Sequence, residues 1–380
     1  MCLMLELPTS VSSVPIEGSS VRVIFGAGAL NELGKIAATD SLSRALLITD
    51  PGIRDAGHVE RAVRSLYRSG IAVRVFDGVG ENPTTIHVGR GLSIAREFKP
   101  DLIVGLGGGS SMDCAKGINF LFTNGGRMQD YWGVDKATQP MLPLIAIPTT
   151  AGTGSDAQSF ALITDPETHQ KMACGDRKTL PRVAILDPEL TATQPAKVAA
   201  ATGIDAVAHA VETAGCNKRD ETSMRLSLQA WELLSSSFAK ALRDPADVES
   251  RRRMLLGAHI SGAAIENSML GAAHALANAL TAVCGTVHGV AVGLMLPHVV
   301  RFNSTDGEPY APLNLPGKQL ADQIDQMLVA GDLPRRLGEV GATRQQIPEL
   351  SSIAAKQWTA GFNPRAVTEA DLAQVFEMAL

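Results

Sequence analysis

The chain has 380 residues, which is long enough for two domains with large cores. Its net charge of −5 and its 4% of aromatic residues supply neither a basic surface for phosphates nor rings for base stacking, so nucleic acid is excluded as a partner. The five cysteines are odd in number and show no CxxC spacing, which excludes a disulfide framework and a zinc knuckle and fits a reducing cytoplasm.

Short β-branched runs alternate with amphipathic stretches in the first half of the chain. The alternation implies a mostly parallel sheet with helices on both faces, and we predict an α/β domain over residues 1–188. Three of its strands are expected between residues 141 and 187. The pattern before them predicts strands at 21–25, 44–49, 73–76 and 101–105, and helices at 29–38, 59–69, 84–98 and 111–122.

Strand signals disappear in the second half, and we predict an all-helical domain over residues 189–380. Beyond residue 306, Pro and Gly break the pattern into several short helices. The longer helices are expected at 198–212, 221–242, 248–267, 270–283 and 289–298.

One run, 281–300, is nearly uncharged and about as long as a membrane span. Because His288, Pro297 and His298 interrupt it, we interpret it as a buried helix and expect no membrane partner. The first twenty residues lack the basic region and long apolar run of a secretory signal, so we expect a cytoplasmic protein.

The stretch 105–116, GLGGGSSMDCAK, ends a predicted strand and opens a helix. Glycines let the backbone approach a pyrophosphate, and the free N–H groups at the helix start receive its charge. The stretch departs from the G-x-G-x-x-G pattern, because Ser110 occupies the last glycine position and the loop follows a later strand. A tight turn that needs glycine for its own conformation is the alternative interpretation.

Two further features favour a nucleotide. The stretch 147–156, IPTTAGTGSD, leaves a strand with hydroxyls and glycines suited to bonding a phosphate, a ribose or a carboxamide. Asp50 ends the second strand, where its carboxylate can accept from a ribose 2′-OH and repel a 2′-phosphate, which favours NAD over NADP. For Asp50 a helix N-cap is an equally open interpretation.

A candidate metal site begins in GIDAVAHAVE, residues 203–212. Asp205 and His209 stand at i and i+4, so in a helix both side chains point from one face and can hold one ion. His274 and His288 follow in a segment of small residues and bring the candidate ligands to four. An Asp/His pair at this spacing is common by chance, but its combination with two later histidines and a nucleotide loop is not.

Five motifs occur in the order and at the spacing of a known family: GGGSSMDCAK, IPTTAGTGSD, GIDAVAHAVE, GAAHALANAL and VHGVAVGLMLPHV. Over roughly residues 25–303 the chain resembles the iron-containing (group III) alcohol dehydrogenase family. The resemblance implies a dinucleotide-binding α/β domain over 1–188, an all-helical metal-binding and substrate domain over 189–380, and a homodimer.

The resemblance also carries the family's functional residues onto this chain. Asn82 would contact a ribose, and Asp50 would select NAD. The implied metal ligands, which are also the predicted catalytic residues, are Asp205, His209, His274 and His288. The predicted cofactor-binding residues are Asp50, Asn82, Gly107, Gly108, Gly109, Ser110, Ser111, Thr149, Thr150, Thr153, Leu162 and Lys171.

Four positions carry departures or open roles. Many family members have a histidine four residues after the third ligand, whereas this chain has Asn278, which can hydrogen-bond but cannot titrate. Asp156 stands where the family usually has glutamate. Glu212 is open between a partner of the metal ligands and a helix cap, and His298 is interpreted as structural or as a wall of the substrate pocket.

The predicted function is a metal-dependent alcohol dehydrogenase that transfers hydride reversibly between a small primary alcohol or diol and NAD, giving an aldehyde or ketone. Three imidazoles and one carboxylate suit Fe²⁺, and Zn²⁺ or another divalent ion stays open. One alternative is a metal-free reductase of the maleylacetate reductase type, against which the complete ligand set argues. The other is a nucleotide-binding protein without catalysis.

Overall fold

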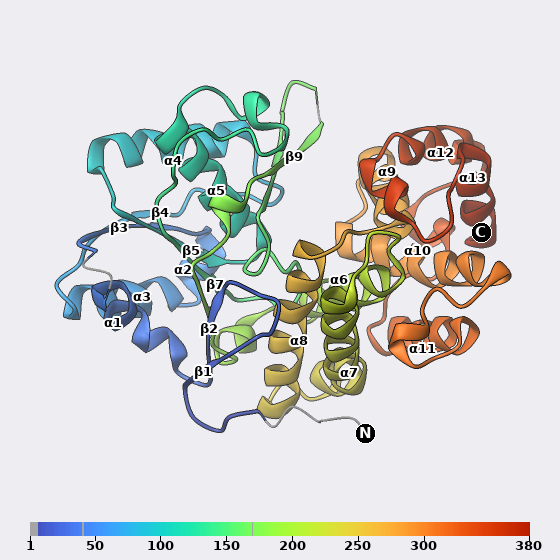
Figure 1. The fold of residues 1–380 in the computed structure, drawn as a ribbon, viewed down its shortest axis with the longest axis horizontal. Helices are drawn as coiled ribbons and strands as arrows, with labels where there is room; N and C mark the ends of the chain where they lie inside the picture. The colour runs from blue at the N-terminus through green and yellow to red at the C-terminus, as the bar shows by residue number, and fades with distance from the viewer. Residues whose placement is uncertain (1–6, 40–41, 169) are drawn as a thin grey trace. The chain divides into compact units, whose positions relative to one another are not determined.

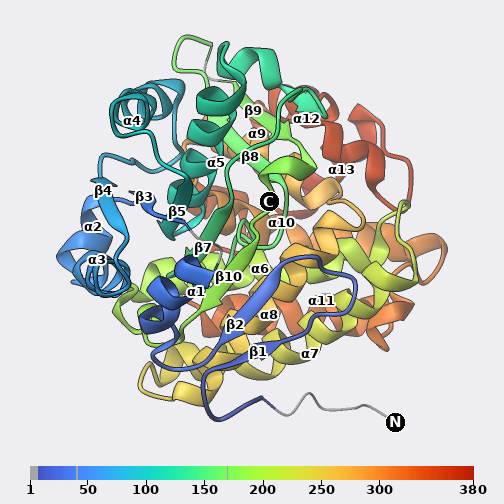
Figure 2. The same ribbon diagram turned by 60° about the vertical axis from the view of Figure 1, so that its left-hand side comes forward.

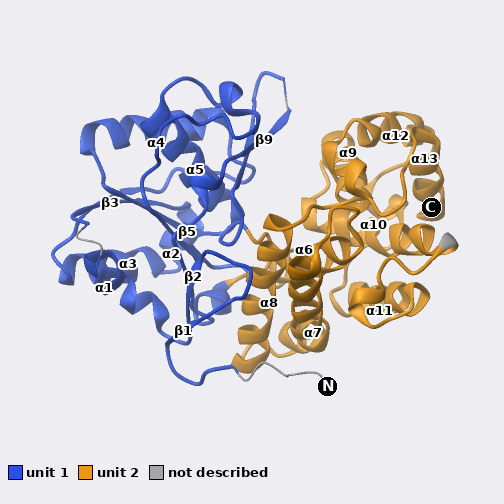
Figure 3. Ribbon diagram, in the orientation of Figure 1, with its two compact units in different colours: residues 1–150, 155–193 blue, residues 151–154, 194–380 orange. Residues whose placement is uncertain are grey.

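The computed structural model describes residues 7–39, 42–168 and 170–380 (Figure 1). They form two compact units, coloured blue and orange in Figure 3. The first consists of Met1–Thr150 and Ser155–Thr193, and the second of Ala151–Gly154 and Gln194–Leu380. The segment Ala151–Gly154, in the middle of the predicted second nucleotide loop, therefore belongs with the helices.

The first unit is built on a seven-stranded sheet in the order β1-β2-β10-β7-β5-β3-β4, which the strand labels follow in Figure 2. Only the β1–β2 pair is antiparallel, and the other neighbours run parallel. The predicted fold class, an α/β domain with a mostly parallel sheet, is confirmed. The strands are β1 (Ser12–Val14), β2 (Arg22–Phe25), β3 (Arg44–Ile48), β4 (Ala72–Phe76), β5 (Leu102–Gly107), β7 (Leu144–Pro148) and β10 (Val183–Leu186).

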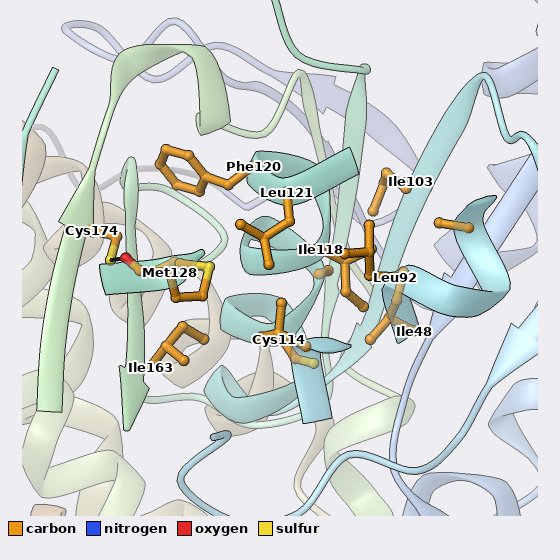
Figure 4. Packing of buried hydrophobic residues seen from close by; sticks show 14 of the residues in the cluster. Ile48, Leu92, Ile103, Cys114, Ile118, Phe120, Leu121, Met128, Ile163 and Cys174 are labelled. Carbon is orange, nitrogen blue, oxygen red and sulfur yellow. Dashed lines mark hydrogen bonds between the residues drawn. The ribbon is translucent and has the colours of Figure 1, made fainter. Parts of the chain in front are cut away.

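Both faces of this sheet are buried, which explains why its strands read as continuous apolar runs. Successive side chains of a strand point to opposite faces, so Leu46 and Ile48 of β3 join one core cluster while Ala45 and Leu47 join the other. Figure 4 shows part of the first cluster, with Ile118 and Ile48 of β3 among its labelled members. The covering helices are α1 (Leu33–Thr39), α2 (Pro51–Asp55), α3 (His58–Arg68), α4 (Thr85–Phe98) and α5 (Gly109–Asn124).

A second, three-stranded sheet has the order β6-β9-β8. The strand expected within SFALITD is present as β8 (Phe160–Thr164), but it lies in this sheet rather than in the large one. The other two strands of this sheet, β6 (Gly133–Val134) and β9 (Lys171–Gly175), were not predicted, because neither a two-residue strand nor a run of mixed polarity shows a period. Short 3-10 turns are η1 (Ala29–Glu32), η2 (Met128–Tyr131), η3 (Arg177–Thr179) and η4 (Leu190–Thr193).

Every regular element of the second unit, in the part of the chain that the structure describes, is helical, as predicted. Acidic caps start two of the long helices: Asp220 accepts from Ser223 N, and Asp247 accepts from Ser250 N. The α-helices are α6 (Ala196–Gly215), α7 (Glu221–Arg243), α8 (Val248–Glu266), α9 (Ala272–Cys284), α10 (His288–Asn303), α11 (Gly317–Ala330), α12 (Ile347–Ala355) and α13 (Glu369–Met378). The 3-10 turns are η5 (Ser304–Asp306), η6 (Ala311–Leu313), η7 (Leu337–Val340), η8 (Arg344–Gln346) and η9 (Trp358–Phe362).

The run 281–300 is not one helix, so its interpretation as a single buried helix was wrong, whereas the separate helices expected at 270–283 and 289–298 are present as α9 and α10. Gly285 ends α9 with a left-handed φ of 67°, and α10 begins at His288. Among the described residues, no helix combines the length and the apolar character needed to cross a membrane.

Candidate functional site

Two candidate metal ligands come from the middle of α6. Asp205 and His209 are about one turn apart, so both side chains point from the same face of the helix. Nε2 of His209 lies 3.6 Å from Oδ1 of Asp205, and both residues are buried. The helical period alone therefore accounts for this pair.

The other two candidates stand at the starts of α9 and α10. His274 lies in the first turn of α9, with its Nε2 3.5 Å from Oδ1 of Asp205. His288 is the first residue of α10, with its Nε2 3.9 Å from the same oxygen. Ligand atoms of Asp205, His209 and His274 lie within 4.8 Å of one another, close enough to share a metal ion. The structure thus brings all four predicted residues together.

Glycines on α10 set the approach of His288. A Cβ on Gly289 would collide with the carbonyl oxygen of Ala201 on α6, and a Cβ on Gly293 would lie 2.9 Å from Ile204. Two glycines four residues apart thus let α10 pack close to α6. This close contact places the first residue of α10 beside Asp205.

Two atoms that face this cluster have no hydrogen-bond partner. Oδ1 of Asp205 and Nε2 of His274 are both buried and unpaired. Buried polar atoms are normally hydrogen-bonded, and leaving one unpaired costs about 1–3 kcal/mol. A divalent cation would satisfy both atoms, and three imidazoles with one carboxylate are donors that Fe²⁺ and Zn²⁺ accept. The residues present therefore fit a metal ion.

The cluster is also electrostatically prepared for a cation. Burial opposes ionisation of Asp205, but the neighbouring imidazoles, His209 foremost, hold the pKa of Asp205 below its ordinary value. Burial lowers the pKa of His209, whereas the carboxylates of Glu212 and Asp205 outweigh burial and raise the pKa of His274. A buried carboxylate that stays ionised carries a negative charge that attracts a metal ion.

Glu212 has both of the roles that its sequence position left open. Its Oε1 accepts a hydrogen bond from Ala273 N over 2.7 Å, which caps the first turn of α9. Its Oε2 is hydrogen-bonded to Nδ1 of His274, the ring nitrogen that faces away from Asp205. The same carboxylate therefore serves the helix and the candidate ligand.

The candidate nucleotide residues of the first unit gather at the carboxyl ends of β3, β5 and β7, which are neighbours in the sheet. Asp50 follows β3, the glycine loop ends β5, and Thr149 and Thr150 follow β7. The chain leaves β3 toward β4 on one side, while β5 lies on the other. Such a topological switch point is where open α/β sheets bind their ligands.

Within this region the backbone is open to a phosphate. Gly107 has a φ of 146°, and a Cβ there would lie 2.9 Å from Cβ of Ser111. Gly108 is the N-cap of α5 and offers no capping side chain, so the first N–H groups of that helix are open to an anion. The hydroxyls of Thr149 and Thr150 are buried without a hydrogen-bond partner. A bound nucleotide would supply the partners that these groups lack.

The remaining predicted cofactor residues divide between the units. Nζ of Lys171 lies 3.4 Å from Oδ1 of Asn82, so this pair is brought together in the first unit. Leu162 lies on β8, and its N–H donates to Asp113. Thr153 falls within Ala151–Gly154 and so belongs to the second unit.

Comparison with known proteins gives these geometries their context. A family model described as "Iron-containing alcohol dehydrogenase" matches residues 20–188, and one described as "Fe-containing alcohol dehydrogenase family, C-terminal" matches residues 199–380. The chain belongs to the iron-containing alcohol dehydrogenase family. The resemblance inferred from the motifs, and with it the prediction of an alcohol dehydrogenase of the iron-containing type, is confirmed at the level of the family.

Relatives of this dehydrogenase align with it almost from end to end. Alcohol dehydrogenase 4 of Schizosaccharomyces pombe is 35% identical, covering 98% of this chain and 91% of that protein. The NAD-dependent methanol dehydrogenase of Bacillus methanolicus is 32% identical, covering 94% of this chain and 97% of that protein. The crystal structure of a 1,3-propanediol oxidoreductase superposes with a TM-score of 0.90 at 32% identity, covering 97% of this chain and 100% of that one.

In this dehydrogenase, Asn278 lies on α9 one turn after His274. Its Nδ2 donates to Oε1 of Gln357 over 3.2 Å, so the position is hydrogen-bonding and not titrating. His298 does not join the metal cluster: its neighbours are Asp325, Arg301 and the backbone of Arg335, and burial lowers its pKa. These neighbours agree with the interpretation of His298 as a structural or pocket-wall residue rather than a further metal ligand.

Sequence reasoning overlooked one buried group of the dehydrogenase, Lys116 in α5. Its Nζ donates to the carbonyl oxygens of Ser155, Gln158 and Phe160 at 2.7–2.8 Å, and no part of the residue is exposed. Asp113 lies one turn earlier and accepts from Ser155 Oγ over 2.6 Å. A charged pair at i, i+3 inside an otherwise uncharged helix was the available signal.

Proposed function

We propose that this protein is an NAD-linked dehydrogenase of small primary alcohols or diols, with Fe²⁺ held by Asp205, His209, His274 and His288. In this proposal residues 1–188 bind the dinucleotide and residues 189–380 bind the metal and the substrate. The observation that carries it is the convergence of three imidazole nitrogens, each at 3.5–3.9 Å, on one buried carboxylate oxygen. Imidazole-rich sets also accept Zn²⁺, so the iron rests on the family's description.

The chemistry that such an ion supplies is that of a Lewis acid, which lowers the pKa of an alcohol hydroxyl near it and polarises a carbonyl in the reverse direction. The chain's own residues hold the ion and position the reactants. Holding the two reacting carbons about 3–3.5 Å apart and excluding water is the protein's main contribution to hydride transfer. Asn278 can hydrogen-bond but cannot titrate, so this side chain would not relay the hydroxyl proton.

The choice of NAD over NADP is supported by Asp50. Its carboxylate lies at the end of β3, beside the glycine loop, where it can accept from a ribose 2′-OH and repel a 2′-phosphate. The N–H groups of Gly109 and Ser110 at the start of α5 would receive the pyrophosphate. Asn82 and Lys171 would contact the ribose on the nicotinamide side.

The substrate class is supported by the relatives, whose names include methanol and 1,3-propanediol. The small residues of α9, the helix that carries His274, suit a short substrate; Ala275 and Ala277 are examples. The proposal includes a homodimer and a cytoplasmic location. The described cysteines Cys114, Cys174, Cys216 and Cys284 are all free thiols, as a reducing compartment requires.

The test is to purify the protein without added metal, measure its metal content, and assay Fe²⁺ and Zn²⁺ with NAD and NADP on short alcohols, diols and their aldehydes. We expect turnover that requires metal and prefers NAD. Reduction without metal would favour a reductase of the maleylacetate reductase type. Nucleotide binding with no turnover on any substrate would indicate a non-catalytic nucleotide-binding protein.

A further inference from the structure

Glu212 continues the ligand face of α6. It follows Asp205 and His209 at i+7 and i+3, so the three side chains point from one side of the helix. Glu212 is buried, and it is not one of the four candidate ligands. Its two oxygens have different partners: Oε1 accepts from Ala273 N, and Oε2 is bonded to Nδ1 of His274. The carboxylate thus receives two donors from adjacent residues of α9.

Helix α9 depends on side chains from other segments for its N-terminal cap. Its N-cap residue is Gly271, which makes no side-chain cap. Ala273 N donates to Glu212, and Ala272 N lies 3.4 Å from Oδ1 of Asn363. A Cβ on Gly271 would lie 3.1 Å from Oε1 of Glu212 and 3.3 Å from Oδ1 of Asn363, so glycine leaves room for both caps.

Asn363 is itself held by a buried polar network. Its Nδ2 donates to Oδ1 of Asn303 over 2.7 Å, and Nδ2 of Asn303 donates back to its Oδ1 over 3.0 Å. Nδ2 of Asn303 also lies 2.8 Å from the hydroxyl of Tyr310, which is buried. Asn363 therefore caps α9 from a fixed position through Ala272 N, whereas Nδ1 of His274 is hydrogen-bonded to Glu212.

The bond to Glu212 determines the tautomer of His274. Both oxygens of Glu212 face N–H groups of α9, so in the neutral ring Nδ1 of His274 is the nitrogen that donates to Glu212 and carries the proton. Nε2 then keeps its lone pair, and Nε2 is the atom that faces Asp205 at 3.5 Å. Imidazole ligands need an unprotonated nitrogen toward the ion, and an acceptor on the far nitrogen provides it.

We propose that Glu212 is a positioning residue for the metal centre: one carboxylate fixes both the start of α9 and the tautomer of His274, so metal affinity depends on a residue that does not bind the metal. The inference rests on the proposed function only in that it takes the four candidate ligands to bind an ion. It assigns no role in turnover to Glu212.

The test substitutes Glu212→Gln, because glutamine has one acceptor oxygen for two donors. If that oxygen stays on Ala273 N, the amide donates to Nδ1 of His274, and the proton moves to Nε2, the atom the metal needs. We expect Zn²⁺ affinity, measured by competition with a chromogenic chelator, to fall about 10–100-fold. The matched control Glu369→Gln, at an exposed position in α13, should leave the affinity unchanged.

Asn363→Ala separates positioning from helix capping. The substitution removes a cap from α9 and a hydrogen-bond partner from Asn303. It leaves the hydrogen bond between Nδ1 of His274 and Glu212 intact. We expect the metal-free variant to unfold at a lower temperature than the wild type, with Zn²⁺ affinity within about threefold of it. Equal losses of affinity in Asn363→Ala and Glu212→Gln would overturn the inference, as would wild-type affinity in Glu212→Gln.

A measurement on the wild type covers the case in which Glu212→Gln does not fold. Long-range ¹H–¹⁵N spectra of the Zn²⁺-loaded, histidine-labelled protein should show His274 protonated at Nδ1 and metal-bound at Nε2. The opposite tautomer would overturn the inference. A wild type that binds no Zn²⁺, Co²⁺ or Fe²⁺ at all would refute the proposed function instead, so the two failures are distinguishable.

Discussion

The hydroxyl of Ser111 donates a hydrogen bond to Oδ2 of Asp50 over 3.2 Å, while Oδ1 of Asp50 accepts from Ile53 N over 3.1 Å. One carboxylate therefore caps α2 and also reaches the helix that follows the glycine loop. The two interpretations that the sequence left open for Asp50 are compatible, because a carboxylate has two oxygens and the residue stands at the end of β3, beside β5.

Asp50→Asn should relax the choice of cofactor without weakening the cap. Asparagine caps helices about as well as aspartate but carries no charge to repel a 2′-phosphate. We expect the ratio of kcat/KM for NAD to that for NADP to fall by at least about tenfold, which is about 1.4 kcal/mol. Asp50→Ala should show the same relaxation and lose about 1 kcal/mol of stability as well. An unchanged ratio in both variants would assign selectivity to other residues.

Removal of the metal should abolish dehydrogenase activity and lower the unfolding temperature. Addition of Fe²⁺ or Zn²⁺ at a hundred times the dissociation constant should restore about 2.7 kcal/mol of stability. His274→Ala should lose both responses, because it removes a ligand. His298→Ala, which removes a histidine outside the cluster, should keep them. Thermal melts with and without metal, followed by activity assays, distinguish these outcomes. A His274→Ala variant that is still stabilised and activated by metal would contradict the ligand assignment.

Gly289→Ala should weaken metal binding through the packing of α10. The new methyl group meets the carbonyl oxygen of Ala201 and lies 3.4 Å from Cβ of Asp205, so α10 must shift and take His288 with it. We expect a loss of about 1–3 kcal/mol in unfolding free energy. Gly89→Ala on α4 is the control, because a Cβ there meets nothing within 4 Å and should be neutral or stabilising. Metal titration of both variants provides the comparison, and wild-type metal affinity in Gly289→Ala would show that α10 tolerates the displacement.

Lys116→Met should destabilise the first unit and weaken cofactor binding. It leaves the carbonyl oxygens of Ser155, Gln158 and Phe160 without their shared donor, and breaking a buried charged network costs about 3–5 kcal/mol. These residues belong to the connection between β7 and β8, which contains the predicted second nucleotide loop. The KM for NAD should therefore rise more than kcat falls. The same substitution at exposed Lys318 should change neither quantity. Denaturant unfolding and steady-state kinetics measure the two effects.

Local periodicity was sufficient for much of this fold. The apolar runs of β3 and β5 predicted buried parallel strands, and the i, i+4 spacing of Asp205 and His209 predicted a shared face on α6. Both signals depend only on neighbours within a few residues, so a sequence alone contains them. The two-residue strand β6 was missed, because two residues leave no period that can be read.

The sequence by itself determined the elements and the chemistry of the candidate ligands. Only the tertiary structure decided which of those groups meet. Two glycines on α10 bring His288 to Asp205, and Glu212 reaches across to α9, where it holds His274 and caps the helix at once. Contacts between distant segments depend on how whole helices pack, and no spacing along the chain encodes that packing.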